Sequence, residues 1–251
     1  MDDFVDWRGL SAFVHELQFL LAELKASVTD GRTGFELVVL FFESEQDIFE
    51  NCDDDGLVGA VFQNDAVEFL GYFGSRCEDK DWLCDELMRL YEQDSFGVRS
   101  GIFDNTAQYL SEEKIRLLAV RLQRELQQEP KDYEKRRWLS AIESLARQLK
   151  DPDLFEQARR WGRQKLSSED TCDIARIWFE ADDAETALFL LQDIGSECVR
   201  SHGYNELLLA IHTKLGNRSE QSMVAWRMFR EHRCQDSLNA LLQVIGKDQR
   251  N

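Results

Sequence analysis

Residues 133–247 repeat one pattern three times: an apolar helical stripe, a short polar turn and a second apolar stripe. The turns contain Asp151-Pro152-Asp153, then Asp182-Asp183, then Gly216-Asn217-Arg218, about one TPR-like or HEAT-like period apart. A chain of this kind stacks its helical hairpins, because each hairpin buries its apolar face on its neighbours. The sequence therefore predicts an all-α fold of stacked helical hairpins, either a TPR/HEAT-like α-solenoid or an irregular helical array.

The second hairpin, residues 172–194, fits a tetratricopeptide repeat best. Ala175, Trp178 and Ala187 stand where such a repeat has small, aromatic and small residues. Small residues let two helices approach closely, and the aromatic side chain fills the groove between them. The third hairpin fits loosely, because Gln221 stands near a position where a small residue is expected. The repeats are therefore predicted to be TPR-like rather than a regular tetratricopeptide array.

The first half of the chain is also predicted to be helical. One apolar stripe with helical spacing consists of Trp7, Leu10, Val14, Leu17, Leu21 and Leu24. Gly31 and Gly34 are expected to break the chain after it. Residues 35–42 have the composition of a strand, but we predict a helix because their apolar face continues without a turn signal. The predicted division is an acidic N-terminal helical region at 1–128 and TPR-like hairpins at 129–251, packed as one continuous array.

Negative charge is concentrated in the first half of the chain. Residues 1–113 contain 26 Asp and Glu against 7 Lys and Arg, whereas residues 114–251 contain 22 against 23. Carboxylates repel phosphate, so direct binding of nucleic acid is not expected. A basic protein or a cation is a more plausible partner of this half, although we favour the simpler interpretation that the acidity only keeps the protein soluble.

The carboxylates that crowd one predicted helix end and its turn are the expected contacts for a basic partner. They are Glu43, Glu45, Asp47, Glu50, Asp53, Asp54 and Asp55. Residues 43, 47 and 50 are spaced four and three apart, which would place them on one helical face. A basic surface would relieve their mutual repulsion.

Two patterns suggest metal sites, and neither is complete. Asn51, Asp53, Asp55 and Gly56 match the first half of a calcium loop, but position twelve is Phe62 instead of the closing Glu. The possible zinc ligands are Cys198, His202, His232 and Cys234. His232 and Cys234 are closer together than zinc ligands usually are. We therefore expect no bound metal or other cofactor.

No sequence motif indicates catalysis. Phosphate-binding glycine motifs are absent, and no nucleophile, base or carboxylate pair has a recognisable local context. Arg99, between Asp94 and Asp104, is expected to be an ion-pair partner. We predict that the protein is not an enzyme and has no catalytic residues.

Residues 92–103 read EQDSFGVRSGIF and are followed by YLSEE at 109–113. This segment resembles uncharacterised bacterial helical proteins, including the helical region that follows SWIM zinc fingers in some of them. Those proteins show a D-(Y/F)-G-x-x-(D/S)-G-x pattern after a Leu-rich helix and an acidic stretch upstream, comparable to residues 53–56. The resemblance covers roughly residues 7–125. It implies an all-helical bacterial protein, and no zinc or DNA role, because the SWIM Cys and His residues are absent.

These observations predict a cytoplasmic, non-catalytic protein-interaction module or scaffold of the helical-repeat type. The acidic N-terminal sequence lacks the basic start of a signal peptide, and no apolar run is long enough to cross a membrane. The alternative is an acidic inhibitor or nucleic-acid mimic that occupies the basic cleft of a nuclease or DNA-binding protein.

Overall fold

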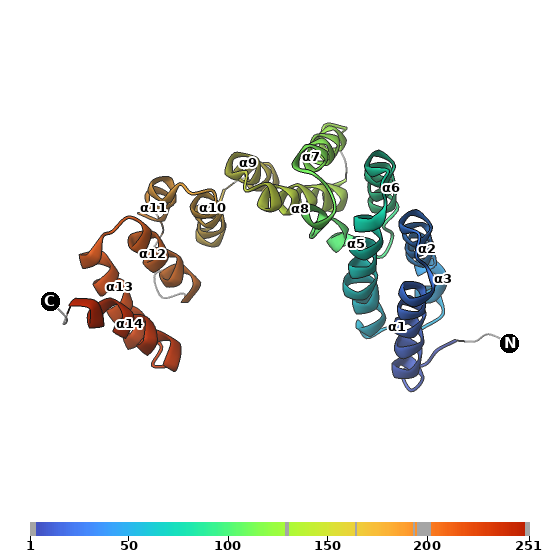
Figure 1. The fold of residues 1–251 in the computed structure, drawn as a ribbon, viewed down its shortest axis with the longest axis horizontal. Coiled ribbons are helices and arrows are strands. Elements are labelled where there is room, and N and C mark those ends of the chain that lie inside the picture. Colours follow the sequence, from blue (N-terminus) through green and yellow to red (C-terminus); the bar gives the residue numbers. More distant parts are fainter. Residues whose placement is uncertain (1–3, 129–130, 164, 193, 195–201, 249–251) are drawn as a thin grey trace. The chain divides into compact units, whose positions relative to one another are not determined.

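The computed structural model describes residues 4–128, 131–163, 165–192, 194 and 202–248. Over these ranges the protein is all-α, as predicted. No β-strand forms in them, and Val5 and Cys52 make a single isolated bridge. The chain divides into two compact units, Met1–Leu149 and Lys150–Asn251, whose helices are labelled in Figure 1. None of the described helices is both long and apolar enough to cross a membrane.

The first unit is an array of helices interrupted by two irregular regions, residues 51–56 and residues 93–111. Its elements are α1 (Leu10–Ser27), α2 (Gly31–Glu43), α3 (Glu45–Glu50), α4 (Leu57–Ala60), the π-helical segment η1 (Val61–Ala66), α5 (Val67–Arg76), α6 (Lys80–Glu92), the 3-10 segments η2 (Ser100–Phe103) and η3 (Thr106–Gln108), α7 (Glu112–Leu126) and α8 (Asp132–Leu149). Helix α1 packs against α2, α4 and η1, α2 against α5, and α7 against α8.

Helix α2 forms where the strand-like composition is found, so the helix predicted at residues 35–42 is confirmed. The predicted break at Gly31 and Gly34 is wrong, because both glycines lie inside α2. The side chain of Asp30 caps this helix by accepting a hydrogen bond from the N–H of Thr33 at 2.7 Å. The two glycines are needed for close packing instead: a Cβ atom at Gly34 would lie 2.0 Å from Cδ1 of Phe73 on α5.

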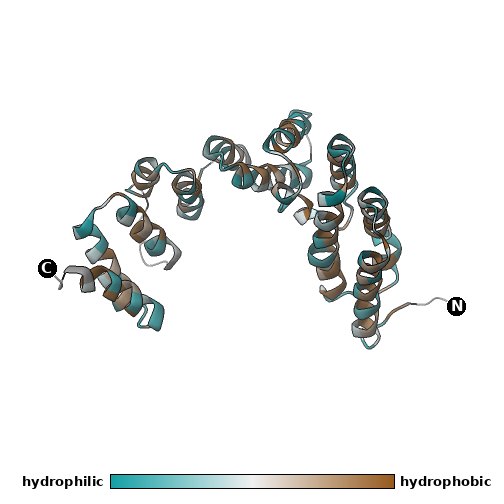
Figure 2. Ribbon diagram, in the orientation of Figure 1, coloured by the Kyte–Doolittle hydropathy of each residue, from teal (hydrophilic) through white to brown (hydrophobic). Residues whose placement is uncertain are grey.

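The core of the first unit is aromatic. Phe35 and Phe42 of α2 are fully buried, as are Phe62 of η1 and Phe73 of α5. Trp7, which was predicted to belong to the apolar stripe of α1, is 70% exposed because it precedes the first turn of the helix. In Figure 2, the brown apolar residues of each helix alternate with teal polar residues around its circumference, as expected for amphipathic helices.

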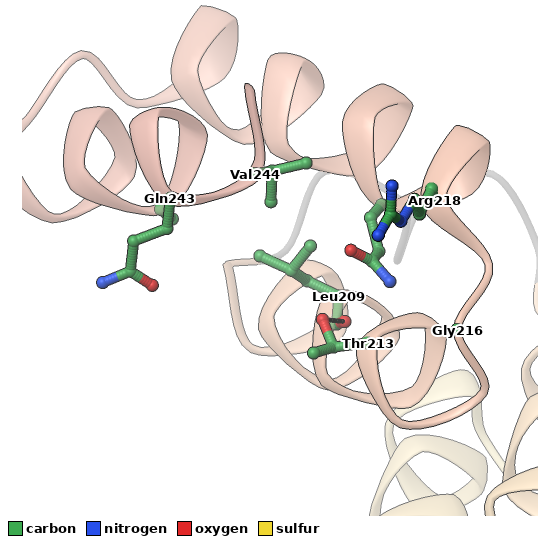
Figure 3. A pocket seen from close by; sticks show the side chains of 8 residues that line it. Leu209, Thr213, Gly216, Arg218, Gln243 and Val244 are labelled. Carbon is green, nitrogen blue, oxygen red and sulfur yellow. Dashed lines mark hydrogen bonds between the residues drawn. The ribbon is translucent and has the colours of Figure 1, made fainter. Parts of the chain in front are cut away.

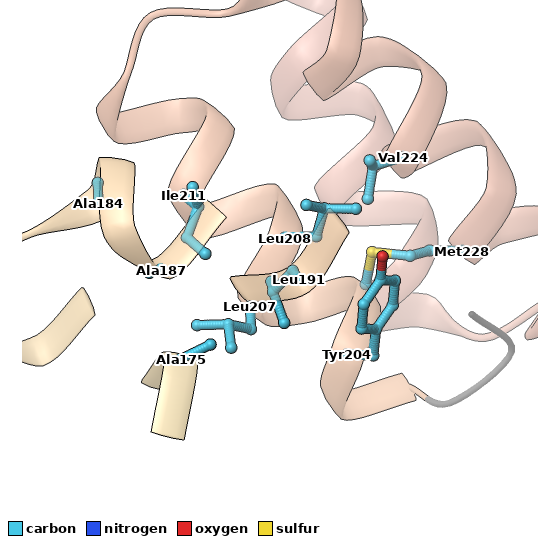
Figure 4. Close-up of a cluster of buried hydrophobic side chains, with 10 residues drawn as sticks. All are labelled: Ala175, Ala184, Ala187, Leu191, Tyr204, Leu207, Leu208, Ile211, Val224 and Met228. Atoms are coloured by element: carbon cyan, nitrogen blue, oxygen red, sulfur yellow. The ribbon is translucent and has the colours of Figure 1, made fainter. Parts of the chain in front are cut away.

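The second unit consists of helices that pack on their neighbours in the sequence. They are α9 (Pro152–Gly162), α10 (Ser168–Glu180), α11 (Ala184–Gln192), α12 (His202–Lys214), α13 (Arg218–Glu231) and α14 (Gln235–Asp248). Figure 4 shows part of the core that joins α10 to α13. Ala175 and Ala187, the small residues singled out in the sequence, are fully buried there. Small side chains at these positions let α10 and α11 approach each other.

The boundary between the two units follows α8, whereas the predicted boundary at 128/129 precedes it. The two helices of the first predicted hairpin both form, as α8 and α9. Helix α8 nevertheless belongs to the first unit, because its apolar face packs on α7. Trp138, Ile142 and Leu145 of that face are all buried.

Replacing Gly34 by Ala should destabilise the first unit by about 1–3 kcal/mol, since the added methyl group would overlap the fully buried ring of Phe73. Gly71→Ala is the matched control in α5, where the new Cβ would make an ordinary contact 3.9 Å from Tyr109. That change should be neutral or stabilising by up to about 1 kcal/mol. Urea denaturation followed by circular dichroism measures both, and equal effects would contradict the proposed close packing.

Candidate functional site

Glu45 does not lie on the predicted acidic surface. It is 2% exposed and forms an ion pair with Arg99, which is 3% exposed, with 2.9 Å between Arg99 Nε and Glu45 Oε2. The guanidinium group of Arg99 also donates to the carbonyl oxygen of Leu90 at 2.9 Å and to that of Phe42 at 3.0 Å. Arg99 thereby connects the end of α2, the start of α3 and the end of α6.

Burial has a strong effect on the electrostatics of the Glu45–Arg99 pair. Burial raises the pKa of Glu45, while the N–H of Ser95 and the guanidinium group of Arg99 oppose that rise. Removing two charges from water is costly, so a buried pair contributes little net stability. Removing only one partner lowers the stability of the fold much more, because the other charge then stays buried without a compensating charge.

Arg99 is delivered by the turn of residues 94–99. The carboxylate of Asp94 accepts hydrogen bonds from the N–H groups of Gly97, Val98 and Arg99, at 2.8, 3.1 and 3.3 Å. Gly97 has φ of +75°, a conformation that glycine adopts without strain. Arg99 was expected to form an ion pair, and it does, but its closest partner is a glutamate 54 residues earlier in the chain.

Helix α8 holds the other end of the same irregular region. The side-chain amide of Gln148 donates to the carbonyl oxygen of Phe103 and accepts from the N–H of Ala107, at 2.5 and 2.7 Å. Ser144 donates to Oδ1 of Asp104 at 2.6 Å. Residues 94–107 are therefore fixed from both sides despite their lack of regular structure.

Two more of the predicted contact residues have structural partners. Glu43 binds Arg89 of α6, with 2.6 Å between Oε1 and Nη1. Asp54 accepts hydrogen bonds from the N–H groups of Gly56, Val58 and Gly59 at the start of α4. Both carboxylates thus have local roles in holding the first unit together.

The remaining predicted residues, Asp47, Glu50, Asp53 and Asp55, are exposed. Glu43 ends α2, whereas Asp47 and Glu50 lie on α3, after an interruption at Ser44. The structure therefore buries Glu45, pairs Glu43 with Arg89 and uses Asp54 as a cap, and it leaves the other four predicted carboxylates exposed in the acidic turn region of residues 47–55.

No group of three or more His, Cys, Asp or Glu side chains in the described part of the chain could hold a metal ion. The incomplete calcium pattern falls on the turn before α4, where Asp54 caps backbone N–H groups instead. Of the possible zinc ligands, Cys198 and the side chain of His202 lie outside the described residues.

A groove in the second unit was not predicted. It lies between α12 and α14, which both pack against α13. Two pockets of about 310 and 480 Å³ adjoin in it and share Leu209, Thr213 and Ala240 as lining residues. In Figure 3, Val244 of α14 faces Leu209 and Thr213 of α12, and Arg218 lies at one side.

The groove combines an apolar interior with polar groups at its margins. Leu209, Ala210 and Met228 line it together with Ala240 and Val244. The polar side chains around them are Glu206, Thr213, Lys214, Arg218, Gln221, Asp236, Ser237 and Gln243. Sequence periodicity could not reveal this groove, because it shows the apolar face of a single helix and not the space left between two helices.

A family model described as a family of unknown function (DUF6880) matches residues 2–168. The Glu45–Arg99 pair and the acidic turn region lie inside the matched residues, and the groove between α12 and α14 lies outside them. No curated protein and no solved structure matches the chain.

Replacing Arg99 by Ala should destabilise the first unit by about 3–5 kcal/mol, because Glu45 would remain buried without its partner. Arg116→Ala provides the control. Arg116 forms an exposed ion pair with Glu112, so its loss should change stability by less than about 1 kcal/mol. The free energy of unfolding from urea titrations distinguishes the two variants. Similar losses of stability in the Arg99 and Arg116 variants would show that the buried ion pair does not anchor the first unit.

Proposed function

This chain belongs to the DUF6880 family of unknown function, and we propose that it is a non-catalytic protein-interaction module that accepts a segment of a partner protein in the groove between α12 and α14. One observation carries the proposal: the two adjoining pockets form a continuous, partly apolar hollow on packed helices. Grooves of this kind accept the apolar side of a peptide, with polar groups at the margin setting its orientation.

The dimensions and chemistry of the groove support a peptide as its occupant. Each pocket has a volume typical of a site for a small ligand or for several side chains. Both acidic and basic groups stand at its margins, including Glu206, Asp236 and Arg218, so several hydrogen-bonding patterns could be matched along a backbone. A helical scaffold holds such groups in fixed positions, which lowers the entropic cost of binding.

A cytoplasmic location belongs to the same proposal. Cys52, Cys77, Cys84, Cys172 and Cys234 are free thiols in the described part of the chain. Free thiols are typical of proteins in reducing compartments. The buried Cys84 is also protected chemically, because burial raises the pKa of its thiol to about 11.

A second candidate function is an acidic inhibitor that occupies the basic cleft of a nuclease or DNA-binding protein. The exposed carboxylates of the acidic turn region favour it, since Asp47 and Asp53 form no ion pair with any described residue. The first unit contains 31 Asp and Glu against 16 Lys and Arg, which adds a long-range attraction for cations. This surface belongs to the first unit and the groove to the second, so each candidate can be tested with its own variants.

Filling the groove should abolish peptide binding. Ala240→Trp places an indole between the two pockets, whereas Asn239→Trp adds the same group at an exposed position of α14 and serves as the control. Peptides selected from a random display library on the natural protein should bind the Asn239 variant equally well. They should bind the Ala240 variant at least about tenfold more weakly. Selected peptides that bind both variants equally, or a failure to select any, would contradict the proposal.

Neutralising the acidic turn region should slow association with a basic protein. The test variant carries Asp47→Asn, Glu50→Gln and Asp53→Asn. Its control carries Glu16→Gln, Glu23→Gln and Glu78→Gln, which change the net charge of the same unit equally at other exposed positions. Stopped-flow association with a histone-like basic protein should be several-fold slower for the test variant than for the control. The difference should vanish at about 1 M salt, where the screening length falls to about 3 Å. Equal rates for both variants would rule out a specific acidic contact.

A further inference from the structure

A polar pocket of about 340 Å³ opens in the first unit between η1 and α5 on one side and the 3-10 segments on the other. Six of its lining side chains carry an oxygen acceptor: Gln63, Asn64, Glu68, Asp104, Asn105 and Gln108. No Lys, Arg or His lines the pocket, and Val67 is its one apolar side chain. The pocket therefore presents carboxylate and carboxamide oxygens without a cation to balance them.

The first wall of the pocket is the π-helical segment. A π-helical turn is rare, and such turns are found disproportionately at functional sites. Nδ2 of Asn64 donates to the carbonyl oxygen of Ala60 at 3.0 Å, which fixes the orientation of this amide. Oδ1 of Asn64 accepts no hydrogen bond from any described residue, so it remains available to a donor in the pocket.

The second wall is held rigidly although it has little regular structure. Ser144 of α8 binds Oδ1 of Asp104, and Gln148 fixes the backbone on both sides of that residue. The two walls come close together at Gly101, where a Cβ atom would make ordinary van der Waals contacts with Oδ2 of Asp104 at 3.4 Å and with the carbonyl oxygen of Gln63 at 3.5 Å. Asn64 and Asp104, one on each wall, are thus held in position before any ligand arrives, which favours binding.

We propose that this pocket binds the guanidinium group of an arginine side chain. A guanidinium group offers five N–H donors in one plane and no acceptor, which complements a pocket that offers two carboxylates and four carboxamide oxygens. Hydrogen bonds from guanidinium to carboxylate are about twice as strong as those between neutral groups. The charge of the first unit, with 31 acidic and 16 basic residues, further favours a cationic ligand.

Other ligand classes fit less well. An anion would meet Glu68 and Asp104 without a neutralising charge. A divalent metal ion is disfavoured because the described residues include no group of three or more His, Cys, Asp or Glu side chains around one point. An apolar ligand would bury carboxylates and carboxamides without hydrogen bonds, at a large cost in free energy.

The probe for this proposal is N-acetyl-arginine methylamide, titrated into the full chain labelled with nitrogen-15. The side-chain amide signals of Asn64, Asn105 and Gln108 should shift with saturation. The citrulline analogue has nearly the same shape but no charge, and it should bind at least about tenfold more weakly. The lysine analogue, which lacks the planar donor array, should also bind more weakly than the arginine analogue.

Three substitutions complete the test. Glu68→Gln and Asp104→Asn preserve size and hydrogen bonding, and each should weaken binding about tenfold. Glu23→Gln, at an exposed position of α1 outside the pocket, should leave binding unchanged within about twofold. Ala240→Trp should also have no effect, so failure of the groove proposal and failure of this one can be told apart. Unchanged affinity in the Glu68 and Asp104 variants, or equal affinity for the citrulline or lysine analogue, would overturn the proposal.

Discussion

The buried ion pair between Glu45 and Arg99 determines how the irregular part of the first unit is held. Arg99 is carried by a turn that Asp94 stabilises, and its guanidinium group reaches both Glu45 and two backbone carbonyl oxygens. A segment without regular secondary structure has few hydrogen bonds of its own. Its position therefore depends on such long-range contacts, and the pair fixes residues 94–103 against α2, α3 and α6.

The polar pocket depends on the same constraint. One of its walls consists of residues 101–108, which continue directly from the turn that carries Arg99. Ser144 and Gln148 of α8 hold the far end of this wall, so α8 contributes to the site without lining the pocket. This arrangement gives a physical reason for α8 to belong to the first unit. The groove in the second unit is lined instead by helices α12, α13 and α14 and by the short turn at Gly216.

The sequence was sufficient to predict the features that depend on local periodicity. The all-α fold and the helix at residues 35–42 both follow from residue spacing, and the structure confirms them. The features that depend on distant contacts could not be predicted. Gly34 was interpreted as a chain break because its close approach to Phe73 involves a helix much later in the chain. Glu45 was assigned to the surface because its partner lies 54 residues away. The polar pocket combines residues from two segments about 40 positions apart, and neither segment alone carries a recognisable motif.

Hydrogen exchange of the backbone amides that Asp94 binds tests most directly whether the Glu45–Arg99 pair anchors this segment. In the natural protein, the amides of Gly97, Val98 and Arg99 should exchange slowly, at rates close to those of the core of α2. Glu45→Gln removes the charge but keeps the size of the side chain. It should speed exchange at these three amides by about tenfold or more, while the amides of α7 and α8 remain protected. Unchanged exchange at Gly97, Val98 and Arg99 in this variant would contradict the anchoring role of the pair.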